Sequence, residues 1–185
     1  MEGAAPDDVI AFWREAGPAR WFAADPDFDR VLAGRFGALH ARAATGALAA
    51  WEEDAPGALA LLLLTDQFPR NIYRGSAHAF ATDPMAREIA KRALARGFDQ
   101  ATEPGLRAFF YLPFEHHEDA GAQARAVRLF EALTQAGGDP EGLRYARIHA
   151  ELIARFGRFP HRNPVLGRIS TPDETAYLAA GGFAG

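Results

Sequence analysis

The sequence predicts an all-α protein, and three observations favour that fold class. Leu and Ala are abundant, whereas the 185 residues include only four Val and six Ile, and β-branched residues favour strands while Leu and Ala favour helices. Seven of the 12 prolines stand where a helix would begin, a position that suits the missing N–H of proline. Glycines follow several apolar runs, where a left-handed residue commonly ends a helix. No strong alternation of apolar and polar residues indicates a strand.

These signals predict about eight helices along the chain. Asp25, Asp83, Asp139 and Thr171 precede or open helical runs as capping residues, and Glu174, three positions after Thr171, completes a capping box. The predicted ranges are Pro6–Ala16, Pro26–Ala50, Pro56–Phe68, Pro84–Arg96, Pro104–Leu112, Ala120–Ala136, Pro140–Phe156 and Pro172–Ala180.

The apolar spacing supports these helices and indicates which of them is buried. Leu143, Ile148, Leu152 and Phe156 recur at helical intervals. The helix over Pro56–Phe68 is apolar on nearly all sides, which is typical of a helix in the centre of a protein.

Bulk properties predict a single domain, residues 1–185, in the cytoplasm. The net charge of −4 provides no basic field for nucleic acid. The absence of cysteine excludes disulfides, thiolate metal sites and a cysteine nucleophile. The chain opens without a secretory signal, and the longest apolar run, from Ala58 to Leu64, is too short to span a membrane.

Three helical runs end at a proline beside polar residues. These junctions are Thr65–Gly75, Phe109–Asp119 and Arg155–Arg168, and the first and third nearly repeat one motif, Phe-Pro-Arg-Asn against Phe-Pro-His-Arg-Asn. Together they gather carboxylates, arginines, asparagines and histidines at helix ends. The sequence therefore predicts a site there, and the repeated motif also has a second interpretation, a duplicated helix-pair geometry that serves folding.

The first junction places Asp66 on the apolar stripe of a buried helix, where a carboxylate is costly unless it is paired. Arg70, four residues later, is one partner, in which case the pair fixes the end of the helix. The alternative interpretation is a carboxylate held beside a ligand.

The second junction contains Glu115 and His116, a pair suited to acid–base chemistry near neutral pH. The alternative is a histidine that is hydrogen-bonded in a turn. His149, on the helix that leads to the third junction, is either a further catalytic candidate or a satisfied core residue. The adjacent histidines match no zinc signature, so we expect no metal.

The third junction is rich in arginine, whose planar fork suits carboxylate or phosphate. The arginines either form an anion site or pair with Asp66, Glu115 and Glu151. The sequence shows no Walker loop, no GxGxxG fingerprint and no GxSxG elbow, so we expect no cofactor.

Four stretches carry a resemblance to a known family: LLLLTDQFPRNIYRG, ATDPMAREIA, FFYLPFEHHED and HAELIARFGRFPHRNPVLGRISTPDE. With the opening VIAFWREAGPARWF, they make nearly the whole chain similar to the bacterial family called domain of unknown function 924. The resemblance implies antiparallel helix pairs in a compact tetratricopeptide-like superhelix. It implies no activity. The family's polar motifs fall on Asp66, Gln67, Arg70, Asn71, Glu115, His116, His149, Arg158, His161, Arg162 and Asn163, and His117 is excluded because relatives often have another small polar residue there.

Two functions follow as hypotheses. The first is a binding module that holds a small anionic molecule or a peptide carboxylate through Asp66, Arg70, Asn71, Arg158, His161, Arg162 and Asn163. The second is an enzyme that acts on a small anionic metabolite, with Glu115, His116 and His149 as the catalytic residues; it predicts Glu115 within a few ångströms of a histidine. A third interpretation is that the clusters only lock helix ends together. We expect the three junctions to meet at one cavity, and no nucleic acid or membrane as a partner.

Overall fold

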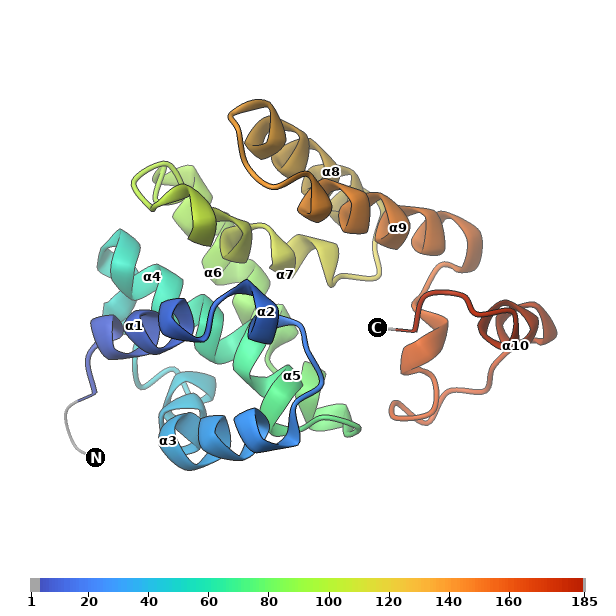
Figure 1. The fold of residues 1–185 in the computed structure, drawn as a ribbon, viewed down its shortest axis with the longest axis horizontal. Coiled ribbons are helices and arrows are strands. Elements are labelled where there is room, and N and C mark those ends of the chain that lie inside the picture. Colours follow the sequence, from blue (N-terminus) through green and yellow to red (C-terminus); the bar gives the residue numbers. More distant parts are fainter. Residues whose placement is uncertain (1–3, 185) are drawn as a thin grey trace. The chain divides into compact units, whose positions relative to one another are not determined.

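The computed structural model describes residues 4–184, and every regular element in that range is a helix, which confirms the all-α prediction (Figure 1). The chain falls into two compact units, the first ending at Pro113 and the second beginning at Phe114. The single domain and the tetratricopeptide-like superhelix stay predictions. In the part of the chain that is described, none of the helices is both long and apolar enough to cross a membrane.

The first unit is built from α-helices joined by short 3₁₀ segments. Its α-helices are α1 (Pro6–Ala16), α2 (Pro18–Trp21), α3 (Pro26–Ala44), α4 (Ala55–Leu62), α5 (Phe68–Ile72) and α6 (Asp83–Ala95), its 3₁₀ segments are η1 (Ala49–Glu53), η3 (Ala77–Phe80) and η4 (Pro104–Phe110), and a π-helical segment, η2 (Leu63–Gln67), joins α4 to α5.

An aromatic core holds the first unit together. The Trp13 ring of α1 lies 5.3 Å from Phe68 and 5.7 Å from Phe109, centroid to centroid. All three side chains are almost completely buried, and so is every residue of α4 from Gly57 to Leu62. The prediction that this apolar helix is central is therefore confirmed.

The helix that begins at Ala55 does not stop at the first proline junction, contrary to the sequence prediction. A proline inside a helix removes one N–H and crowds the carbonyl four residues earlier. Here the chain widens into η2, with the Phe68 N–H bonded to Leu63 O, and then continues as α5 through Pro69. Pro69 has no N–H to donate to the Thr65 carbonyl. That carbonyl accepts a 2.6 Å hydrogen bond from the Thr82 hydroxyl instead.

The second unit contains a hairpin of two long helices followed by a shorter helix. Its elements are α8 (Ala120–Gln135), α9 (Pro140–Phe156), the 3₁₀ turn η5 (Pro160–Arg162) and α10 (Pro172–Ala179), and α7 (Leu112–Glu115) crosses the boundary between the units. Helices α8 and α9 lie side by side (Figure 1). Gly142 brings α9 close to α8, because a Cβ there would lie 2.7 Å from the Phe130 ring.

Most predicted bounds agree with the structure, and the differences have local causes. The helix that starts at Pro26 ends at Ala44, and not at Ala50, because Gly46 turns the chain with φ +77°. The run after Pro104 is a 3₁₀ helix instead of an α-helix, and α2 was not predicted. Thr82, and not Asp83, is the N-cap of α6. The capping roles of Asp25, Asp139 and Thr171 are confirmed.

Candidate functional site

A buried carboxylate and a buried imidazole meet in the second unit. Glu115, at the end of α7, places Oε1 3.1 Å from Nδ1 of His149 on α9. Both residues are almost completely buried, at 2% and 7% exposure. Gln123 of α8 fixes the backbone here by donating to the carbonyls of Glu115 and His117, at 2.6 and 2.7 Å. The distance that acid–base chemistry requires is thus present.

The hydrogen bonds of His149 determine which ring nitrogen carries the proton. Nδ1 lies between the Glu115 carboxylate and the Tyr145 carbonyl, at 3.1 and 2.9 Å, and both groups are acceptors. Nδ1 therefore carries the hydrogen, and Nε2 has the lone pair. The pKa of His149 is lowered to about 3, mainly by burial, with the nearby His116 and Arg162 acting in the same direction. The ring is neutral at pH 7.

His161 and Arg162 both contact the buried Phe159 ring. The His161 imidazole stacks at 5.7 Å between centroids, and the Arg162 guanidinium lies 4.5 Å from the ring centroid. Arg162 also donates to the His116 carbonyl at 3.0 Å. Burial lowers the pKa of His161 to about 4, with Arg162 as the next cause. His116, His149, His161 and Arg162 together form what we call the histidine cluster.

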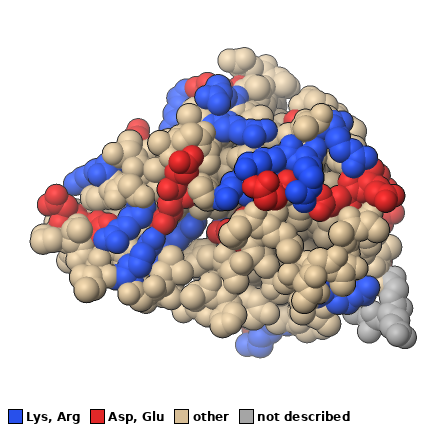
Figure 2. All heavy atoms as spheres, turned by 180° about the vertical axis from the view of Figure 1, so that it is seen from behind, with Lys and Arg blue, Asp and Glu red and all other residues tan. Residues whose placement is uncertain are grey.

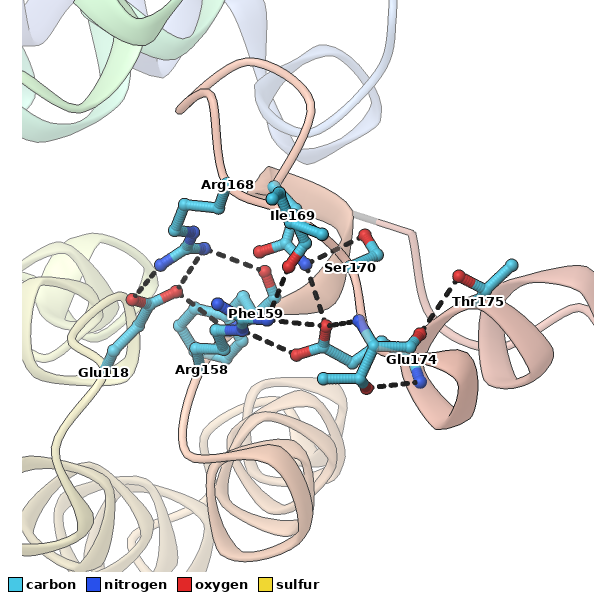
Figure 3. Close-up of polar contacts among 10 residues, drawn as sticks. Glu118, Arg158, Phe159, Arg168, Ile169, Ser170, Glu174 and Thr175 are labelled. Atoms are coloured by element: carbon cyan, nitrogen blue, oxygen red, sulfur yellow. Dashed lines mark hydrogen bonds and ion pairs between the residues drawn. The ribbon is translucent and has the colours of Figure 1, made fainter.

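Arg158 and Asn163 belong to a separate network around Glu174 (Figure 3). Arg158 makes a two-point pair with the Glu174 carboxylate, at 2.6 and 2.8 Å, and Asn163 donates to the same group at 3.1 Å. The hydrogen bond from Arg158 lowers the pKa of Glu174 to about 2. Glu174 is 2% exposed. Both residues, predicted as ligand donors, therefore hold a buried carboxylate in place.

The neighbouring arginine is also occupied. Arg168 makes a two-point pair with Glu118, at 2.6 and 2.9 Å, and Glu118 accepts the Phe159 N–H at 2.8 Å (Figure 3). Burial acts to raise the pKa of Glu118, but these hydrogen bonds outweigh it, so the pKa is lowered. The second and third junctions are joined by this pair. The N-cap of α8 is Asp119, whose side chain accepts the Ala122 N–H.

The first junction is a network of ion pairs within the first unit. Arg70 donates two hydrogen bonds to Asp83, at 2.9 and 3.0 Å, and lies 3.4 Å from the buried Asp66 carboxylate. Asp66 also accepts from the Gln67 amide at 2.5 Å. Asn71 donates to Asp29 at 2.9 Å. The interpretation of Asp66 and Arg70 as an ion pair that fixes a helix is what the geometry supports.

Of the predicted residues, the structure brings Glu115, His116, His149, His161 and Arg162 together in the second unit. The assignment of all predicted residues to a site, and the meeting of the three junctions at one cavity, stay predictions. Two residues outside the prediction also contact the cluster, Phe159 and Phe183. No sequence signal indicated them, because only the fold brings them to His149.

Figure 2 shows arginine and lysine side chains beside acidic ones over one face of the molecule. Within residues 4–184, no group of three or more histidines or carboxylates is arranged to hold a metal ion.

Comparisons with known proteins place these features in a family context. The family model described as "Bacterial protein of unknown function (DUF924)" matches residues 9–182. A solved structure, that of the protein of unknown function ATU0120 from Agrobacterium tumefaciens, superposes with a TM-score of 0.90 at 48% identity. The match covers 95% of this chain and 97% of that one. No curated protein matches the chain.

Proposed function

We propose that this chain, which belongs to the bacterial DUF924 family, binds a small anionic ligand at the histidine cluster of its second unit. The observation that carries the proposal is electrostatic. Arg162 is buried and donates to the His116 carbonyl, and its positive charge acts against protonation of both His149 and His161. Such a cluster is stabilised by a negative charge. Arg70, Arg158 and Arg168 each pair with a carboxylate, Asp83, Glu174 and Glu118 respectively.

An anionic ligand would change the protonation of the cluster. His149 and His161 are neutral at pH 7 because burial lowers the pKa of each. A negative charge beside them raises those pKa values, so that binding takes up protons from solution. The affinity therefore increases as the pH falls, and the ligand is held by imidazolium N–H groups together with the guanidinium.

A thermal-shift screen with inorganic phosphate and a panel of mono- and dicarboxylates tests the proposal. We expect at least one of these anions to raise the melting temperature, and to raise it more at pH 6 than at pH 8. Arg162→Met removes the charge and keeps the length of the side chain, and it should abolish the shift. Arg144→Ala is the control, because Arg144 lies exposed on the same region of the chain and pairs with Glu141. Equal shifts in the wild type and in Arg162→Met would contradict the proposal.

A second candidate function, acid–base catalysis, is favoured by the 3.1 Å contact between Glu115 and His149. A carboxylate that orients the Nδ1–H of a histidine leaves Nε2 as a positioned base, the arrangement found in many hydrolytic and isomerising enzymes. On this proposal, His149 removes a proton from the bound anion and Glu115 stabilises the imidazolium that forms.

Each anion that shifts the melting temperature is then incubated with the protein in D₂O and followed by proton NMR. Catalysis predicts turnover or proton exchange in the ligand. His149→Gln should stop the reaction while the thermal shift persists. Binding without any chemical change in the ligand supports the first function and rejects the second.

A further inference from the structure

The segment that follows α10 folds back over its own helix. Residues 181–183, which we call the strap, begin with Gly181 at φ +80°. The Gly182 N–H bonds to the Tyr177 carbonyl at 3.0 Å, and the Phe183 N–H bonds to the Tyr177 hydroxyl at 2.8 Å. A Cβ at Gly182 would lie 2.4 Å from the Tyr177 ring. The strap therefore follows a path that its two glycines permit.

This path places the Phe183 ring against two imidazoles of the histidine cluster. The ring centroid lies 4.8 Å from that of His149 and 5.6 Å from that of His161, both edge-to-face. The same ring packs against Leu152, Ile153 and Phe159 and is itself half-buried. Two phenylalanine rings thus contact His149 and His161, the buried Phe159 and the half-buried Phe183.

We infer that the strap is a removable cover of the histidine cluster, and that Phe183 determines which molecules reach His149 and His161. The strap is held by two hydrogen bonds to Tyr177, one to its carbonyl and one to its hydroxyl, and by the packing of one ring. The adjacent loop is held by two-point arginine pairs, which are stronger. Segments with few buried contacts open most readily. The inference rests on the proposed function, because the cover would control the entry of a ligand to the same histidine cluster.

The water-excluding effect of the cover is measurable without any ligand. The titratable and charged groups that face His149 are Glu115, His116, His161 and Arg162. Those that face His161 are Arg162, Glu118, Arg168 and His116. Burial is the largest cause of the low pKa of both histidines. Removal of the cover should therefore let water reach the rings and raise both titration midpoints.

The experiment is an NMR titration of the histidine side chains in the wild type and in three variants. Phe183→Ala should raise the midpoints of His149 and His161 by about 1 pH unit, the scale of shift that partial burial produces. Tyr177→Phe removes the hydroxyl that ties the strap and keeps the ring, and it should raise both midpoints by less. Phe22→Ala, at an exposed phenylalanine of the first unit, should leave the midpoints unchanged.

Unchanged midpoints in a folded Phe183→Ala variant would overturn the inference. If that variant does not fold, Tyr177→Phe decides: a rise supports the strap as a cover, and no rise overturns it. The spectra of His40 and His78, in the first unit, report whether a variant disturbs the chain elsewhere. The titration is independent of any ligand, so failure of the anion screen and failure of this test are separate results.

Discussion

The two copies of the phenylalanine–proline motif show how similar residues serve different ends in the two units. In both copies the Phe is completely buried, and the Asn donates to a carboxylate, Asp29 for Asn71 and Glu174 for Asn163. The arginines differ. Arg70 pairs with Asp83, whereas Arg162 lies over an aromatic ring and donates to a carbonyl.

The extra residue of the second copy, His161, accounts for much of this difference. It follows Pro160 in a 3₁₀ turn, and its ring stacks on Phe159. In the first copy, Arg70 directly follows Pro69 inside an α-helix and reaches two aspartates. Phe, Pro and Asn thus supply the structural part of the motif, while the residues between Pro and Asn determine which groups the arginine contacts.

The largest expected effect tests the shared part of the motif. Phe68→Ala and Phe159→Ala should each lower the free energy of unfolding by about 3–5 kcal/mol, because both rings are completely buried. Urea unfolding measures both. Tryptophan fluorescence reports the first variant, since all three tryptophans lie in the first unit, and circular dichroism reports the second. A loss below about 1 kcal/mol at Phe159 would show that the two copies are not equivalent in packing.

A smaller effect is expected at the two asparagines. Asn71→Ala and Asn163→Ala should each cost about 1.5–3 kcal/mol, because each removes a hydrogen bond to a carboxylate. The same urea experiment measures the loss. Asn163→Ala should not affect the pKa of His149, because Asn163 belongs to the Glu174 network. A shifted His149 titration would show that the Glu174 network and the histidine cluster are coupled.

The smallest expected effect is on the pH dependence of stability, and it concerns His161, the residue inserted in the second copy of the motif. Below pH 6.5 the unfolded chain binds more protons than the folded one, because the folded pKa values are about 3 for His149 and about 4 for His161. Stability therefore falls as the pH falls, by about 1.4 kcal/mol per pH unit for each histidine. His161→Gln should reduce that slope by one such contribution between about pH 6 and 5. Chemical unfolding monitored by circular dichroism at several pH values checks it, and an unchanged slope would show that His161 titrates normally.

Much of the fold was predictable because its signals are local. Pro140, Asp139 and Gly157 mark both ends of α9 correctly, and the Thr171–Glu174 capping box marks the start of α10. The end predicted at Pro69 was wrong because the hydrogen bond that this proline removes is replaced by one from the distant Thr82 hydroxyl, and because the helix widens into a π turn before it. No local sequence pattern indicates either feature.

The site was predictable in its residue types but not in its pairings. The contact of Glu115 with a histidine was foreseen, since both stood out as polar groups at helix ends. The partners of Arg158 and Arg168 were not: Arg158 pairs with Glu174 and Arg168 with Glu118, whereas the sequence suggested Asp66, Glu115 and Glu151. Phe183 has no sequence signal, because its place beside His149 depends on the glycine turn after α10.

The π-helical segment between α4 and α5 has a consequence for the comparison of relatives. A π turn holds one residue more than an α turn, so η2 stores a surplus residue in an otherwise continuous helix. A relative that lacks one residue here can keep the helix and still have the side chains beyond it turned by about 100°. In a sequence alignment, a one-residue gap within η2 would then indicate that Arg70 and Asn71 point in a different direction in the two proteins. Equivalent residues beyond η2 should therefore be identified by the helix face they occupy, and not by their alignment column.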